Sequence, residues 1–133
     1  MKLHKILMTA GLLLATTAAM ATPATDELFA RYKAEGAAGF DAARGDKAWH
    51  KESKGEEGQT MSCSTCHGQD LGKEGKHHKT NKVIAPMAPS ANKERFTDAK
   101  KIEKWFKRNC NDVLARECSA QEKGDFLKFL LGK

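Results

Sequence analysis

After residue 21 the sequence has no apolar run longer than a few residues. A helix needs about 20 apolar residues to cross the hydrocarbon core of a membrane, so we expect no membrane insertion of this part of the chain. The sequence also lacks internal repeats, low-complexity tracts and the alternating pattern of half-buried strands. These absences favour a single all-α domain over a repeat array or a β-rich fold.

A strong excess of one charge sign is missing as well. The chain has 23 lysines and arginines against 17 aspartates and glutamates, which gives a net charge of +6. Two of these positive charges, Lys2 and Lys5, lie at the start of the chain. The remaining excess is too small to indicate a nucleic-acid partner, and we expect none.

The first 21 residues have the pattern of a secretory signal peptide. Two lysines precede an apolar stretch over residues 6–14, and Ala19-Met20-Ala21 is a small-x-small cleavage site. We therefore predict a signal peptide at residues 1–21 and a single domain at residues 22–133. The mature protein is expected to be a periplasmic monomer.

Apolar residues recur at helical spacing in four later segments. Thr25 can cap the first helix and Thr97 or Asp98 the third, while Ser119 and Glu122 form a capping box for the fourth. The apolar residues of the four helices, in chain order, are Leu28, Phe29 and Tyr32; Trp49; Ile102, Trp105 and Phe106; and Phe126, Phe129 and Leu130.

The second helix, predicted from 41 to about 51, carries Gly45 four residues before Trp49. A glycine at this position leaves room for another helix, and we expect the last helix to cross there. Residues 52–60 and 68–95 contain charged residues, glycines and prolines without helical periodicity, so we predict loops in both segments. A loop as long as the second is typical of a segment that lies against a ligand.

The strongest motif is Cys63-Ser64-Thr65-Cys66-His67, which places an imidazole directly after two thiols. The thiols can add to the two vinyl groups of a haem, and the imidazole can bind its iron. In an exported chain this spacing predicts one covalent haem c, bound by Cys63, Cys66 and His67.

Two other kinds of site can be built from the same cysteines. A zinc site would combine Cys63 and Cys66 with His77 and His78, but adjacent histidines lack the usual spacing of zinc ligands. A thioredoxin-like dithiol requires a strand–helix–strand pattern, which the surrounding sequence does not have. Haem attachment is therefore favoured over both.

Two residues compete for the iron position opposite His67. An electron-transfer cytochrome would place Met87 there, because Met61 is too close to the attachment motif. Asn109 is the other candidate, since it lies on the apolar face of the third helix, where a buried amide needs a partner. A helix-end asparagine that bonds the backbone or adopts the left-handed conformation explains the same spacing.

The two remaining cysteines are Cys110 and Cys118. An exported chain permits a disulfide between them. In one continuous helix their Cα atoms would be about 12 Å apart, which is more than a disulfide allows. If they pair, we expect the helix to end near Asn109, with Asn111 and Asp112 in a turn.

The sequence resembles the sphaeroides haem protein family of exported monohaem cytochromes c over most of residues 22–133. The blocks that carry the resemblance are residues 62–68 with the haem motif, 84–91 (IAPMAPSA), 95–98 (RFTD) and 103–111 (EKWFKRNCN). The last block is far more specific than the haem motif alone. Gly45 and Trp49 also resemble the first-helix pattern of class I cytochromes c.

The resemblance implies a class I cytochrome c-like fold, with helices and loops wrapped around one covalent haem. It implies His67 as the proximal iron ligand, Asn109 as the distal ligand, and a disulfide between Cys110 and Cys118 beside it. It also implies oxygen binding and a dihaem cytochrome c as electron donor.

An amide oxygen suits Fe(III) better than Fe(II). We therefore expect reduction to release Asn109 and to open the iron to oxygen or nitric oxide, while the released amide can donate a hydrogen bond to the gas. The alternative is a simple six-coordinate electron carrier with His67 and Met87 as ligands. In either case we expect an electron-transfer or gas-binding protein rather than a dedicated enzyme.

Overall fold

The computed structural model describes residues 20–133. The predicted signal peptide, residues 1–21, therefore lies almost entirely outside the described residues. The elements, in chain order, are α1 (Pro23–Ala34), α2 (Ala42–His50), β1 (Ser53–Lys54), β2 (Thr60–Met61), α3 (Cys63–His67), β3 (Gly75–Lys76), β4 (Val83–Ile84), α4 (Ala99–Leu114) and α5 (Ala120–Leu130). The fold is helical, as predicted.

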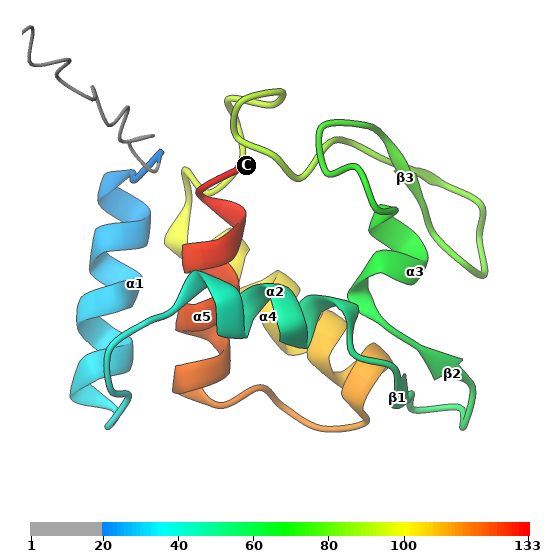
Figure 1. The fold of residues 1–133 in the computed structure, drawn as a ribbon, viewed down its shortest axis with the longest axis horizontal. Helices are drawn as coiled ribbons and strands as arrows, with labels where there is room; N and C mark the ends of the chain where they lie inside the picture. Colours follow the sequence, from blue (N-terminus) through cyan, green and yellow to red (C-terminus); the bar gives the residue numbers. More distant parts are fainter. Residues whose placement is uncertain (1–19) are drawn as a thin grey trace, which may run out of the picture.

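Two short antiparallel hairpins interrupt the segments that we predicted as loops. Strand β1 pairs with β2, and β3 pairs with β4, with two residues in each strand. Strands of two residues are too short to show an alternating pattern in the sequence. Figure 1 shows both hairpins on the same side of the molecule as α3, away from α1.

Within the part of the chain that the structure describes, no helix is both long enough and apolar enough to cross a membrane.

Helices α2 and α5 cross in close contact, as predicted from Gly45. A Cβ atom added to Gly45 would lie 2.1 Å from the carbonyl oxygen of Asp125, so only glycine permits this approach. One turn later, the buried Trp49 ring packs against the rings of Phe126 and Phe129, with both pairs of ring centroids 6.2 Å apart. This crossing fixes the wall against which the haem motif lies.

The buried carboxylate of Asp125, on α5, also joins α2 and α5, through contacts at the start of α2. It accepts a hydrogen bond from the backbone N–H of Asp41, the N-cap residue of α2, at 2.8 Å. The Nε and Nη2 atoms of Arg44 donate to it at 2.8 and 2.9 Å. A buried carboxylate is tolerated when its oxygens are satisfied in this way.

Helix α1 packs against α4 and α5 through Leu28 and Tyr32, which are fully buried. The hydroxyl of Tyr32 donates to the carboxylate of Glu103 on α4, which also accepts from Lys123 of α5 at 2.9 Å. The N-cap of α1 is Thr22, not Thr25 as we predicted, because Pro23 at the first helical position lets the helix begin earlier.

Candidate haem site

Helix α3 consists of the haem motif itself, Cys63–His67. It begins after Ser62, whose backbone N–H donates to the hydroxyl of Thr65 at 2.9 Å. It ends at Gly68, whose φ of 73° is unfavourable for any residue with a side chain. One helical turn therefore presents both thiols and the imidazole, and both cysteines are free and half-buried.

His67 and Cys63 lie in an environment that disfavours charge. The ring of His67 packs against Trp49, with the ring centroids 5.2 Å apart. Burial lowers the pKa of His67 to about 4, with a smaller contribution from the positive charge of Arg95. The imidazole is thus neutral at ordinary pH, which is the form that binds a metal ion. Burial also raises the pKa of Cys63 to about 12.

The loop after α3 folds back over the motif. A Cβ atom on Gly75 of β3 would lie 2.2 Å from the carbonyl oxygen of Cys66, so the strand backbone lies directly against α3. Further along, the buried Leu71 accepts a hydrogen bond from the N–H of Ala88 at 2.9 Å. The predicted long loop therefore lies against the haem motif at Gly75, and a hydrogen bond joins two of its own segments at Leu71 and Ala88.

Helix α4 carries the other predicted ligand, Asn109. The helix begins at its N-cap Asp98, one of the two predicted caps, and buries Ile102 against α1. The ring of Phe106 stacks with Phe126, with the centroids 6.3 Å apart. Trp105 differs from the prediction: it is 42% exposed, and Arg108 lies over its ring.

Asn109 lies within α4 and not at its end. The helix runs through Asn109 to Leu114, and Ala115 ends it with a φ of 54°. The alternative of a helix-end or left-handed asparagine is therefore wrong. Asn109 is half-buried, and in the described part of the chain its side chain forms no hydrogen bond with another residue.

Cys110 and Cys118 form a disulfide in the structure, with their Cα atoms 5.6 Å apart. The expectation that α4 would end near Asn109 if they paired was wrong, because Asn111 and Asp112 are helical. The chain instead reverses after Leu114 and returns Cys118 to a position beside Cys110. Residues 115–118 are enough for this return, since Cys110 lies only one turn before the end of the helix.

The disulfide gives a first testable prediction. Purified mature protein analysed by mass spectrometry without reducing agent should contain one cross-link between Cys110 and Cys118. We expect Cys118→Ala to lower the free energy of unfolding by about 2–4 kcal/mol, the usual contribution of a disulfide. Two free thiols at these positions would remove the covalent anchor beside Asn109.

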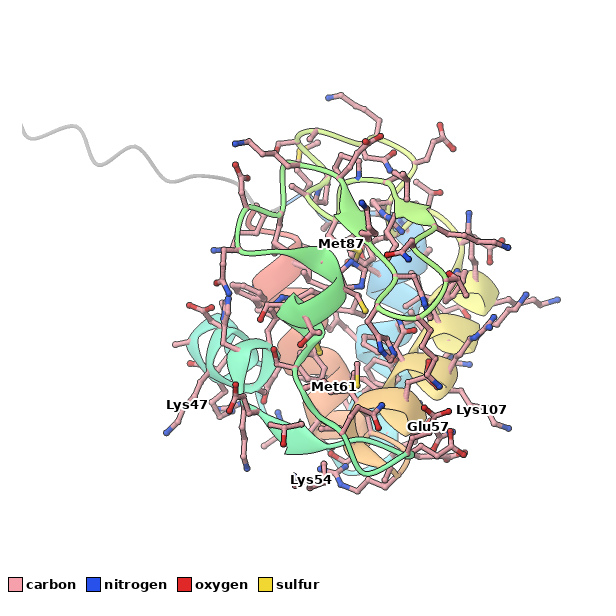
Figure 2. The ribbon with its side chains drawn as sticks, turned by 90° about the vertical axis from the view of Figure 1, so that its right-hand side faces the viewer. Lys47, Lys54, Glu57, Met61, Met87 and Lys107 are labelled. Carbon is pink, nitrogen blue, oxygen red and sulfur yellow. A yellow bond between two sulfur atoms is a disulfide. The ribbon has the colours of Figure 1, made fainter. Side chains whose placement is uncertain are left out.

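The two methionines near the motif occupy different positions. Met87 is half-buried against the core cluster that contains Trp49, Cys110 and Phe126, while Met61 is buried beside Gln59. Figure 2 shows Met87 above α3 and Met61 below it, with α2 and α4 on either side of α3. Cys63 of the haem motif packs against the same core cluster as Met87.

The residues around α3 fit a haem. The indole Nε1 of Trp49, beside His67, is buried and has no hydrogen-bond partner. An unpaired buried N–H costs about 1–3 kcal/mol, and a propionate carboxylate of a haem would be a suitable acceptor. Together with the two free thiols and the neutral imidazole, this indole indicates that α2 and α3 are built around a group with carboxylates.

The competing sites have no geometric support. Within residues 20–133, no three His, Cys, Asp or Glu side chains lie together in a way that could hold a metal ion. His77 and His78 stack on one another, with ring centroids 5.2 Å apart, in the turn between β3 and β4. The strands that flank α3 form separate antiparallel hairpins, unlike the parallel sheet of a thioredoxin-like fold.

Residues 35–130 match a protein family described as Domain of unknown function, DUF1924. The chain is 45% identical over 104 residues to the cytochrome c-type protein SHP of Cereibacter sphaeroides, with 78% of this chain and 80% of the relative covered. It is 39% identical over 83 residues to cytochrome c'' of Methylophilus methylotrophus, which covers 62% of this chain and 58% of that protein.

Solved structures agree with these relatives. The structure of oxidised SHP, an oxygen-binding cytochrome c, matches with a TM-score of 0.75 at 42% identity, over 82% of this chain and 96% of that chain. The solution structure of cytochrome c'' from Methylophilus methylotrophus, which concerns haem-ligand detachment, matches with a TM-score of 0.70 at 32% identity, over 82% and 93% of the two chains. The chain therefore belongs to the family of c-type cytochromes that includes SHP, with a class I-like helical fold and one covalently attached haem c.

Proposed function

We propose that this protein is a periplasmic cytochrome that exchanges electrons with a partner and binds a diatomic gas. Cys63 and Cys66 would attach the haem, and His67 and the amide oxygen of Asn109 would hold its iron in the ferric state. Release of Asn109 on reduction would leave room for oxygen or nitric oxide.

The observation that carries this proposal is the state of Asn109 in α4. The residue is half-buried and in mid-helix, and its amide has no hydrogen-bond partner among the described residues. The next residue, Cys110, is buried and cross-linked to Cys118. Asn111 is likewise half-buried without a side-chain hydrogen bond. What supports Asn109 instead is its place one turn after Phe106, which packs against the core cluster of Trp49, and its position next to the disulfide.

The chemistry of the ligands supports release on reduction. When bound, the haem supplies an iron that alternates between the ferric and ferrous states and can take a gas molecule. A neutral amide oxygen is a hard ligand that prefers the ferric state, whereas the imidazole of His67 binds both states. Asn109 can then turn its NH2 group toward the gas and donate a hydrogen bond.

The relatives support the same function. The SHP structure is that of an oxygen-binding cytochrome c, and the cytochrome c'' structure concerns the detachment of a haem ligand. Both properties are expected of a protein whose distal ligand leaves the iron. The predicted signal peptide supports a periplasmic location, and the family resemblance supports a dihaem cytochrome c as the electron donor.

A six-coordinate electron carrier with His67 and Met87 as ligands is the second candidate. Its support is the position of Met87, half-buried against the core cluster on which Cys63 also packs. A thioether is a soft ligand that holds ferrous iron well. This candidate therefore predicts a closed site in the reduced protein.

The absorption spectrum of the reduced protein separates the two candidates. For the gas-binding function we expect a high-spin ferrous haem that becomes low-spin when nitric oxide is added. A low-spin ferrous haem before any gas is added would contradict this function and favour the electron carrier. The measurement requires only mature protein, a reductant and an anaerobic cuvette.

A further inference from the structure

The backbone on both sides of Met87 is held by hydrogen bonds. Before it, the carbonyl oxygen of Pro86 accepts from Nε of Arg95 at 2.7 Å and from Nδ2 of Asn92 at 3.4 Å. After it, the N–H of Ala88 donates to Leu71 at 2.9 Å. Ala88 itself is 2% exposed, so the segment has little freedom to shift.

Arg95 donates two hydrogen bonds from its side chain to the backbone of this segment. Besides Pro86, it donates through Nη2 to the carbonyl oxygen of Ala85. Among the ion pairs of the described residues, none involves Arg95, so its protein contacts are with these carbonyls. It is half-buried, and its charge is close enough to His67 to lower the pKa of that imidazole.

We propose that Arg95 is a positioning residue that keeps the thioether of Met87 away from the iron and so reserves the distal position for Asn109. The inference rests on the proposed function. Arg95 does this by fixing the carbonyls of Ala85 and Pro86. These residues come just before Met87, whose side chain packs against the core cluster of Trp49, Cys110 and Phe126.

Ligand softness explains why such a restraint is needed. A thioether that reached the ferrous iron would bind it more strongly than an amide oxygen does. The exchange needs no oxidant or reductant, because a sulfur lone pair simply replaces the lone pair of the amide oxygen. The backbone of residues 85–88 sets how far Met87 can reach, so the residue that fixes this backbone would decide between the two functions.

The test compares the mature holoproteins of four variants: Met87→Leu, Arg95→Leu, the double variant of both, and Arg31→Leu as a control. Arg31 is an exposed arginine whose nearest carboxylate, that of Glu103, is 3.7 Å away. For Arg95→Leu we expect the spectral signature of thioether ligation and a low-spin ferrous haem. If Met87 occupies nine in ten ferrous molecules, the apparent dissociation constant for carbon monoxide rises about tenfold.

Several outcomes decide the matter. We expect the double variant to recover the wild-type spectrum and carbon monoxide affinity, and Arg31→Leu to retain both. An unchanged spectrum in Arg95→Leu, or a change that persists in the double variant, would overturn the inference while leaving the proposed function intact. A changed spectrum in Met87→Leu alone would instead contradict the proposed function, because Met87 would already be a ligand.

If Arg95→Leu fails to fold, a conservative substitution at the same position still tests the inference. Arg95→Lys keeps the positive charge. Its single ammonium group replaces the two guanidinium nitrogens that donate to the carbonyls of Ala85 and Pro86. We expect a mixed spectrum that contains a smaller share of thioether ligation than Arg95→Leu. A fully wild-type spectrum in a folded Arg95→Lys protein would show that the paired contact is not required and would contradict the role assigned to it.

Discussion

Replacing both Cys63 and Cys66 by alanine is expected to leave a chain without covalently attached haem. The two thiols are the groups that add to the haem vinyls, and both are free and available on one turn of α3. The intact mass of the purified double variant should equal that of the bare polypeptide. Haem should also be extracted completely under denaturing conditions, whereas the wild-type protein should retain it.

The matched control is the other cysteine pair. Cys110→Ala combined with Cys118→Ala removes the disulfide but should keep the covalent haem, because these residues lie on α4 and after it. Haem that remains attached to the double variant of Cys63 and Cys66 would contradict the attachment site. Zinc in place of iron, in protein matured with a functioning haem-attachment system, would do so as well.

Asn109→Ala is expected to change the coordination of the ferric iron. Alanine has no atom that can reach the metal, so the ferric haem should become five-coordinate or bind water. Absorption and electron paramagnetic resonance spectra of the oxidised protein report this directly. The ferrous protein should change much less, since the proposed mechanism has Asn109 already detached in that state.

Asn111→Ala is the control for this substitution. Asn111 is a half-buried asparagine two residues further along the same helix, and its removal should leave the ferric spectrum unchanged. We expect Met87→Leu to change little in the same measurement. A spectrum altered by Met87→Leu and unaffected by Asn109→Ala would contradict the gas-binding function and support the electron carrier.

Much of the helical framework follows from local signals in the sequence. Asp98 and Ser119 begin their helices as side-chain caps, and the Gly45–Trp49 pair correctly predicted the crossing of α2 and α5. These features depend on residues close together in sequence, or on one glycine whose lack of a side chain has a direct meaning. The haem motif is equally local, because five consecutive residues contain all its groups.

Other features depend on contacts between distant residues and could not be predicted. The length of α4 beyond Cys110 depends on where the chain can reverse, and Ala115 adopts positive φ without the glycine that usually indicates it. Gly124 gave no signal, yet a Cβ atom there would lie 2.1 Å from the ring of Phe40. The contact of Arg95 with the Met87 segment spans nine residues of loop and has no sequence pattern.

The crossing of α2 and α5 also constrains when the domain can form during synthesis. Residues 42–50 find their main packing partner only in residues 120–130, and such non-local contacts must close a long loop before they stabilise the fold. A nascent chain that has not yet reached α5 therefore cannot close its core. Until then, Cys63, Cys66 and His67 belong to an open polypeptide.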